Sequence, residues 1–125
     1  MKRIQIEGTK KSPTVDINPE ARCASFTGRS IHSDAFLFWD DIIDWFKNME
    51  GNYEDFRVEF SFDHINTVTN KCLLQILLII KKALENGDNI TVVWSYDEED
   101  DDMKETGEEL ELLSQCTFEY KTFEI

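Results

Sequence analysis

Two threonines in the stretch HINTVT, residues 64–69, stand where a predicted strand leads into a predicted helix. Asn and Thr at a helix start often accept a hydrogen bond from a free backbone N–H, so Asn66 or Thr67 could be an N-cap. The alternative chemistry is phosphorylation of Thr67, which adds about −1.5 to −2 charges at pH 7 and three acceptor oxygens. A helix start tolerates that anion because its dipole and free N–H groups favour negative charge. The residue types alone leave both interpretations open.

Thr69 is the secondary candidate for phosphorylation, two residues after Thr67. Two residues correspond to about 200° around a helix, so the two hydroxyls cannot face one partner. A phosphate on Thr67 would act on a docked partner, because a neutral hydroxyl in an apolar or acidic contact would become a desolvated dianion. The residues expected to contact a partner are His64, Asn66, Thr67 and Thr69.

Other candidate sites lack the residues that their chemistry needs. A small hydrolase using Asp63 and His64 would need a nucleophile within hydrogen-bond reach, and the chain has no nucleophile motif. The acid run 97–102 lacks the glycine of an EF-hand loop, so it indicates a solvated helix start or an interaction surface. The three cysteines lie far apart and form no C-x-x-C pair, which predicts free thiols. We expect no catalytic residue, no metal site and no cofactor.

Composition sets the broad class of protein. The chain has 125 residues, the usual size of one domain, so we expect a single domain over residues 1–125. Its formal net charge of −13 disfavours nucleic acid and anionic membranes as partners. The first residues have no apolar run typical of a secretory signal, and the apolar run 73–80 is shorter than the about 20 residues that span a bilayer. These features favour a cytoplasmic protein without membrane insertion.

Strands and helices alternate along most of the chain. Phe56, Val58, Phe60 and Phe62 alternate with polar residues, which is the clearest strand signal. The predicted strands are 3–9, 14–18, 22–28, 56–62, 89–96 and 117–123, and the predicted helices run from Ser33 or Asp34 to the segment 48–52, from 66 to about 85 before Gly87, and over 97–115. This order predicts an α/β fold: a mixed, partly parallel sheet of about five to six strands with about three helices packed on it.

Four stretches resemble the SiaC family of small bacterial regulatory phosphoproteins. IEGTKKSP (6–13) is similar to the family's Gly-Thr-x-x-Thr/Ser-Pro opening, and FWDDIIDWF (38–46) is similar to its aromatic first helix. INTVT (65–69) is similar to its Leu-Asn-Thr-Ser-Ser stretch. The longest match is VVWSYDEEDDDMKETGEELELL (92–113), which resembles the family's Trp-x-Tyr, acid-run, Met and Gly-Glu carboxyl half. The resemblance covers essentially the whole chain.

This resemblance implies a STAS-like fold and a partner-switching role similar to that of SpoIIAA-type antagonists of anti-sigma factors. It implies that Thr67, which follows Asn66, is phosphorylated by a dedicated protein kinase and dephosphorylated by a PP2C-like phosphatase. It further implies that the unphosphorylated form binds and activates a diguanylate cyclase or another signalling target, linking the protein to cyclic-di-GMP. The chain departs from the family at SIHSD (30–34), where Ser-Tyr-Pro-Glu-Asn is common, and at Val68, which removes the middle hydroxyl.

A second class of function is a constitutive interaction or scaffold module without a phosphoswitch. In that case the aromatic helix or the acid run 97–102 would bind a basic partner whatever the state of Thr67. Binding led by the acid run would be strongly sensitive to salt, because exposed charges are screened.

Overall fold

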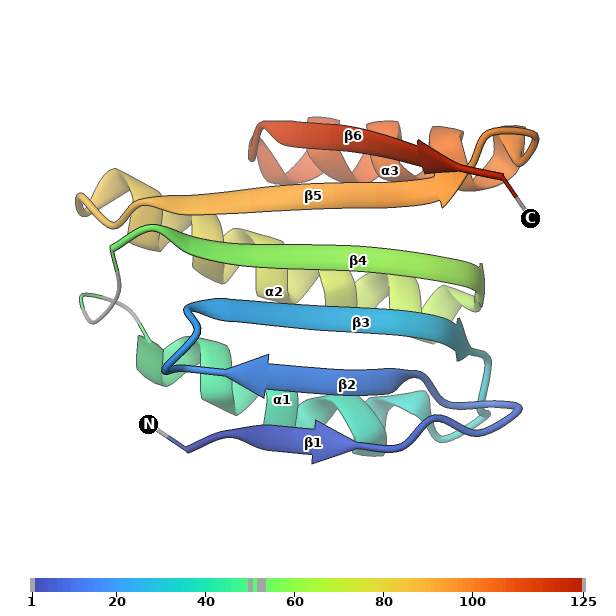
Figure 1. Cartoon of the computed structure of the whole chain (residues 1–125), viewed down its shortest axis with the longest axis horizontal. Helices are drawn as coiled ribbons and strands as arrows, with labels where there is room; N and C mark the ends of the chain where they lie inside the picture. The colour runs from blue at the N-terminus through green and yellow to red at the C-terminus, as the bar shows by residue number, and fades with distance from the viewer. Residues whose placement is uncertain (1, 50, 52–53, 125) are drawn as a thin grey trace.

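The computed structural model describes residues 2–49, 51 and 54–124, and in this part of the chain six strands form one sheet that three helices cover (Figure 1). The strands are β1 (Ile4–Ile6), β2 (Thr14–Asn18), β3 (Cys23–Ser30), β4 (Phe56–Ile65), β5 (Ile90–Asp97) and β6 (Phe118–Phe123). The helices are α1 (Ala35–Met49), α2 (Thr67–Glu85) and α3 (Asp101–Ser114).

The strands lie in the sheet in the order in which they occur in the chain. Strands β1, β2 and β3 pair antiparallel, whereas β3 to β6 pair parallel through the three helical crossovers. Crossovers between parallel strands are right-handed, and here every crossover advances in the same direction, so α1, α2 and α3 lie on one face of the sheet (Figure 1). The predicted α/β fold with a mixed, partly parallel sheet is confirmed.

The hydrophobic core lies between the sheet and the helices. The predicted alternation in β4 is confirmed, because Phe56, Val58, Phe60 and Phe62 are all buried. Trp94 of β5 lies in the middle of this layer, with its ring centroid 6.0 Å from that of Phe60. Burial of such large rings is the main favourable contribution to folding.

Four predicted element ends are wrong. Strand β1 ends at Ile6 rather than at residue 9, because the chain turns there and the N–H of Thr9 donates to the carbonyl of Ser12 at 2.9 Å. The other three errors have causes outside the local sequence. Strand β3 does not stop at Gly28, because the sheet register shifts there and the strand continues to Ser30. Strand β4 does not end near Asp63, because pairing with β3 extends it to Ile65. Helix α3 begins at Asp101 rather than at residue 97, because the preceding carboxylates belong to β5 and to the turn after it.

The end of α2 follows its prediction. Gly87 has a φ of 101°, in the left-handed region that glycine adopts without strain. The N–H of Asp88 donates to the carbonyl of Ala83 at 3.0 Å, so the last turn of the helix is closed.

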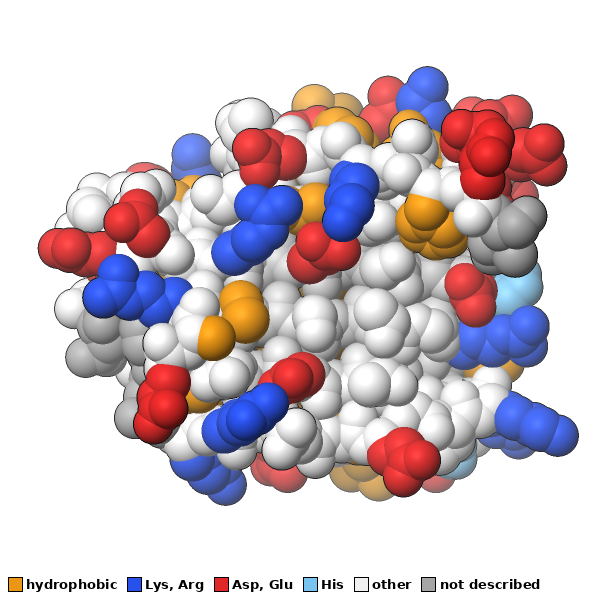
Figure 2. Space-filling view, in the orientation of Figure 1, with side chains coloured by type: hydrophobic (Ala, Val, Ile, Leu, Met, Phe, Trp, Pro, Cys, Tyr) orange, Lys and Arg blue, Asp and Glu red, His pale blue; other side chains and the backbone are white. Residues whose placement is uncertain are grey.

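On the other face of the sheet lies no helix of the described residues. Figure 2 views this face and shows small polar side chains and backbone near its centre, with charged side chains of both signs among and around them. Cross-strand ion pairs join Arg57 to Glu119 at 3.7 Å and Lys121 to Glu59 at 4.0 Å. Exposed pairs of this kind each contribute at most about 1 kcal/mol.

Candidate functional site

A single residue connects β4 to α2. Strand β4 ends at Ile65 and helix α2 begins at Thr67, so Asn66 alone makes the turn. The Oδ1 of Asn66 accepts from the N–H of Thr69 at 2.8 Å, and its Nδ2 donates to the carbonyl of His32 at 3.0 Å. The backbone N–H of Asn66 donates to the carbonyl of Ser30 at 3.1 Å. Asn66 is therefore the N-cap, and its side chain is fully engaged inside the fold.

The hydroxyl of Thr67 has no capping role because Asn66 performs it. Thr67 is the first residue of α2, its side chain is exposed, and within the described residues it makes no hydrogen bond. The backbone N–H groups of the first helical turn lack intrahelical acceptors. An anion attached to Thr67 would meet these donors and the positive end of the helix dipole.

Thr69 lies on the opposite side of the helix and is fully buried, at 0% exposure. Its Oγ1–H donates to the carbonyl of Ser30 at 2.9 Å, so its one hydroxyl proton is used. The Ser30 hydroxyl, 2.6 Å away, must then donate to Thr69 Oγ1, and the indole N–H of Trp39 donates to Ser30 Oγ at 2.9 Å. Every polar group of this buried network has a partner, which is the condition for such a network to be stable.

The buried network corrects two predictions for Thr69. A side chain with no accessible surface cannot contact a partner, and its hydroxyl cannot enter a kinase active site in this fold. Thr69 instead ties the start of α2 to Ser30 at the end of β3, and Ser30 in turn accepts from Trp39 of α1. The prediction that the two threonines face opposite directions is confirmed, because Thr67 is exposed and Thr69 is buried.

His64 lies outside the immediate surroundings of Thr67. It is exposed near the end of β4 and lines a cavity of about 470 Å³ at the carboxyl ends of the parallel strands, together with Arg29, Asp63 and Asp97. Thr67 lines a different cavity, so the structure does not bring His64 and Thr67 to one surface pocket. No hydrogen bond joins Asp63 to His64 within the described residues. A contact of His64 with a partner stays a prediction.

The cavity beside Thr67 has a volume of about 190 Å³ and lies between α2 and α3. It is lined by Thr67, Asn70, Lys71 and Leu74 of α2 and by Glu109, Leu110 and Leu113 of α3, and we call it the Thr67 groove. Lys71 is four residues after Thr67, which places both side chains on the same face of the helix. Helical spacing could have identified Lys71 from the sequence. The α3 residues depend on how the two helices pack, which the sequence pattern does not give.

The groove is largely apolar, and one of the leucines that line it is exposed. Leu113 is 55% exposed, next to the buried Leu110, whereas Leu112, which is 70% exposed, lines a different cavity. The Oδ1 of Asn70 is buried and has no hydrogen-bond partner among the described residues. An uncovered apolar surface beside an exposed hydroxyl is typical of a docking site for another protein.

The acid run comprises the last residue of β5, the turn before α3 and the first residues of that helix. Asp100 is its N-cap and accepts from the N–H of Met103 at 3.0 Å, while Asp101 and Asp102 begin the helix. Figure 2 shows acidic side chains crowded at the corner where β5 leads into α3. Among the described residues, no group of three or more His, Cys, Asp or Glu side chains is arranged to hold a metal ion.

The cysteines are free in the structure. Cys72 and Cys116 are buried, and Cys23 is half-buried. Burial is the largest cause that raises the pKa of both Cys72 and Cys116, so the neutral thiol is favoured at these positions. A thiol held neutral is a poor nucleophile.

None of the described helices combines the length and apolar character needed to cross a membrane.

Comparison with solved structures identifies the same fold in bacterial proteins. The chain superposes on apo-SiaC from Pseudomonas aeruginosa with a TM-score of 0.85 and 22% identity, covering 98% of each chain. A TM-score of 0.85 with 22% identity also relates it to a chain in the crystal structure of the diguanylate cyclase SiaD in complex with its activator SiaC from that organism, covering 95% of this chain and 97% of that one.

Sequence comparison agrees with the structural comparison. An uncharacterized protein of Pseudomonas aeruginosa is 22% identical over 121 residues, which is 96% of this chain and 94% of that protein. The family model described as "SiaC family regulatory phosphoprotein" matches residues 6–123. With nearly its whole length matched, the chain belongs to the SiaC family of regulatory phosphoproteins.

Proposed function

We propose that this chain is a non-enzymatic switch protein whose phosphoacceptor is Thr67. The observation that carries the proposal is the division of roles at the start of α2: Asn66 supplies the cap and Thr69 the buried anchor. The hydroxyl of Thr67 is left exposed, with no hydrogen bond to another described residue. Membership of a family of regulatory phosphoproteins supports this assignment.

The unphosphorylated form docks a partner on the Thr67 groove, whose lining includes the exposed Leu113. A phosphate on Thr67 places about two negative charges at the mouth of this apolar groove, opposite the carboxylate of Glu109 on α3. A partner covering the groove would have to desolvate that dianion, which can cost several kcal/mol. Phosphorylation therefore releases the partner without disturbing the core, because the Thr67 side chain lies outside it.

The proposed partners are a dedicated protein kinase, a PP2C-like phosphatase and a diguanylate cyclase. The last is supported by the family relative whose structure is described as an activator in complex with the diguanylate cyclase SiaD. The proposal places the protein in the cytoplasm, where a protein kinase finds ATP.

Phosphate mapping tests the acceptor directly. The full chain is incubated with ATP and the kinase of its own host, and the modified residue is located by intact mass and fragmentation. We expect one phosphate, on Thr67, with Thr67→Ala unmodified. The matched control Thr69→Val should still be phosphorylated, because its hydroxyl is buried. Phosphate on another residue, or full modification of Thr67→Ala, would show that the acceptor is wrong.

Calorimetric titration with the diguanylate cyclase of the same host tests the switch. We expect Thr67→Ala to bind as the unmodified protein does, and Thr67→Asp and the phosphorylated chain to bind at least about tenfold more weakly, which corresponds to 1.4 kcal/mol. Thr67→Asp should unfold at nearly the same temperature as the unmodified chain. A large loss of stability would mean that Thr67 has a structural role.

The exposed Leu112 and Leu113 also favour a constitutive docking module without a phosphoswitch. That function predicts equal partner affinity for Thr67→Ala, Thr67→Glu and the phosphorylated chain. The same titration therefore separates the two functions.

A further inference from the structure

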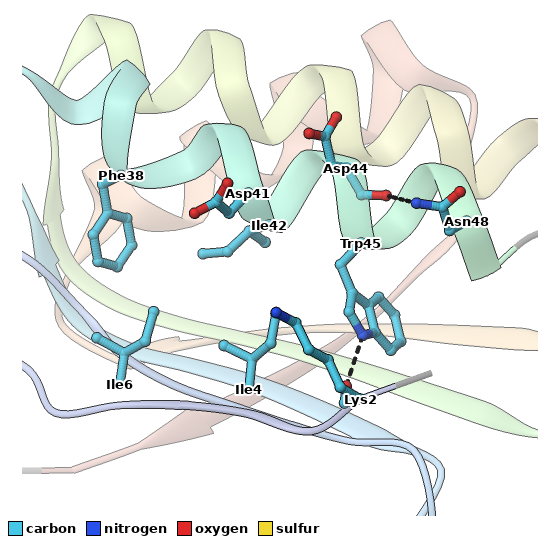
Figure 3. Close-up of a pocket in the computed structure, with 9 residues that line it drawn as sticks. All are labelled: Lys2, Ile4, Ile6, Phe38, Asp41, Ile42, Asp44, Trp45 and Asn48. Atoms are coloured by element: carbon cyan, nitrogen blue, oxygen red, sulfur yellow. Dashed lines mark hydrogen bonds between the residues drawn. The ribbon is translucent and has the colours of Figure 1, made fainter.

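A second cavity lies far from Thr67, between the edge strand β1 and helix α1 (Figure 3). Its volume is about 530 Å³, and none of the residues that line the Thr67 groove line it. Ile4 and Ile6 form the side on β1, and Phe38, Ile42 and Trp45 form the side on α1. In Figure 3 the two isoleucines point toward the helix and Phe38 and Trp45 point toward the strand. We call this cavity the β1 cleft.

The shape of the β1 cleft is fixed by the fold. Ile42 and Trp45 are buried, and the indole N–H of Trp45 donates to the carbonyl of Lys2 at 3.0 Å. This hydrogen bond holds the beginning of β1 against α1 at one end of the cleft, as the dashed line in Figure 3 shows. A preformed apolar cavity binds a ligand without the ordering cost that a flexible surface would have.

The strand beside the cleft has a free edge. Strand β1 is first in the sheet and pairs only with β2, so the backbone groups on its outer side have no strand partner in the described chain. An extended segment of another protein can bind such an edge by adding a strand. Side chains alternate along the added strand, so every second one would point toward α1 and into the cleft.

The charges around the cleft indicate which segment fits. Asp40, Asp41 and Asp44 lie on the exposed side of α1, and Asp41 lies at the mouth of the cleft between Phe38 and Ile42 (Figure 3). Asp41 makes no ion pair among the described residues, and the exposed pair of Asp44 with Lys47 is 3.9 Å long. A segment with Lys or Arg beside its apolar residues would complement these carboxylates.

Charge also argues against a second copy of the chain as the occupant. Each copy carries a formal net charge of −13, so pairing two β1 edges would bring two strongly acidic proteins together. The same net charge attracts a basic segment over a longer range. Lys2 is the one cation that lines the cleft, and its side chain lies along Ile4, exposed and without an ion pair in the described chain.

We infer that the β1 cleft binds an extended segment of another protein, which adds a strand to β1 and presents, on its side toward α1, apolar side chains between β1 and α1 with Lys or Arg next to them. The basic residues of the segment face Asp41 and Asp44. Because β1 has only three residues, the added strand forms few backbone hydrogen bonds, and the apolar contacts carry most of the affinity. This surface is separate from the Thr67 groove, so both can be occupied at once.

Selection of a random twelve-residue peptide display library on the full chain tests the inference. We expect enriched peptides that carry both apolar and basic residues at every second position, the positions that face α1, and amide shift changes confined to residues 2–6 and 38–48 when the best peptide is titrated by NMR. Methylation of the peptide amides that face β1 should weaken binding at least about tenfold, which corresponds to 1.4 kcal/mol. Enrichment of acidic peptides, enrichment of peptides without apolar and basic residues at every second position, or shift changes elsewhere would overturn the inference.

Charge variants provide the matched controls. Asp41→Asn with Asp44→Asn should weaken the selected peptide by about two- to fivefold for each removed charge at low salt, and Lys2→Gln should strengthen it. Asp101→Asn with Asp102→Asn makes the same change in net charge on α3 and should leave affinity unchanged. Equal weakening by both pairs would refute specific complementarity. A concentration-dependent dimer that the selected peptide dissociates would show that the occupant is a second copy.

Discussion

Replacing Thr69 by Val tests the buried network that holds the start of α2. The change keeps the shape of the side chain but removes the hydroxyl, so the bond to the Ser30 carbonyl is lost and the Ser30 hydroxyl has no acceptor. A hydrogen bond contributes about 1 kcal/mol net, and a buried unsatisfied donor costs about 1 to 3 kcal/mol. We therefore expect Thr69→Val to lower the free energy of unfolding by about 2 to 4 kcal/mol.

The same accounting gives the effect of Ser30→Ala and of the double variant. Ser30→Ala leaves the buried indole N–H of Trp39 without an acceptor, which costs about 1 to 3 kcal/mol. In the double variant the Ser30 hydroxyl no longer exists, so its unsatisfied donor disappears from the total. The double variant should therefore lose about 1 to 3 kcal/mol less than the two single losses combined.

Urea unfolding followed by tryptophan fluorescence measures all three variants. Thr67→Val is the matched control on the same helix, and because that side chain is exposed we expect a change within about 0.5 kcal/mol. Single-variant losses that add to within about 0.5 kcal/mol in the double variant would refute the described network. So would a loss for Thr69→Val as small as that for the control.

Three further predictions follow from other contacts. Gly107→Ala should destabilise the protein by about 1 to 3 kcal/mol in the same urea assay, because a Cβ at this position would overlap the Trp94 ring. The control Glu108→Ala, at an exposed position of the same helix, should not lower the free energy of unfolding. Burial and a hydrogen bond to Glu111 raise the pKa of Tyr120, so the stability that this neutral hydroxyl contributes is complete below about pH 10 and is lost as the pH rises from there toward the pKa of the folded state. Above about pH 10 the free energy of unfolding should therefore fall less steeply with pH for Tyr120→Phe than for the unmodified chain, and identical slopes would contradict this. If Thr67 carries phosphate, the Lys71 ammonium should lower the second pKa of that phosphate. A ³¹P NMR titration should then give a higher phosphate pKa in Lys71→Gln, and an unchanged pKa would show that Lys71 does not interact with the phosphate.

The sequence predicts those parts of the fold that depend on local periodicity. Alternation from Phe56 to Phe62 identifies the central strand and its buried face, because a strand with one face in the core needs that pattern. Gly87 identifies the end of α2 for an equally local reason. The extension of β3 past Gly28 is different, since it depends on pairing Ser30 with Ile65, a residue far along the chain.

The candidate site divides in the same way. The position of Thr67 at a strand-to-helix turn can be predicted from HINTVT, and the opposite orientation of Thr69 follows from helical geometry. The partners of Thr69 cannot be predicted from this stretch, because Ser30 and Trp39 come from two other elements. The β1 cleft is also beyond sequence patterns, since it arises from the distance at which α1 crosses the edge of the sheet.

The absence of a loop between β4 and α2 has a consequence for signalling. Asn66 joins a paired strand directly to a helix, its side chain is bonded to His32 between β3 and α1, and Thr69 is bonded to Ser30 of β3. A covalent change at Thr67 therefore has no flexible segment next to it that could convert the change into movement. On the proposed function, the two forms would have nearly the same shape, and a partner would tell them apart by charge. In such a switch the two forms do not differ in conformational energy, so only the kinase and the phosphatase set the fraction of phosphorylated protein.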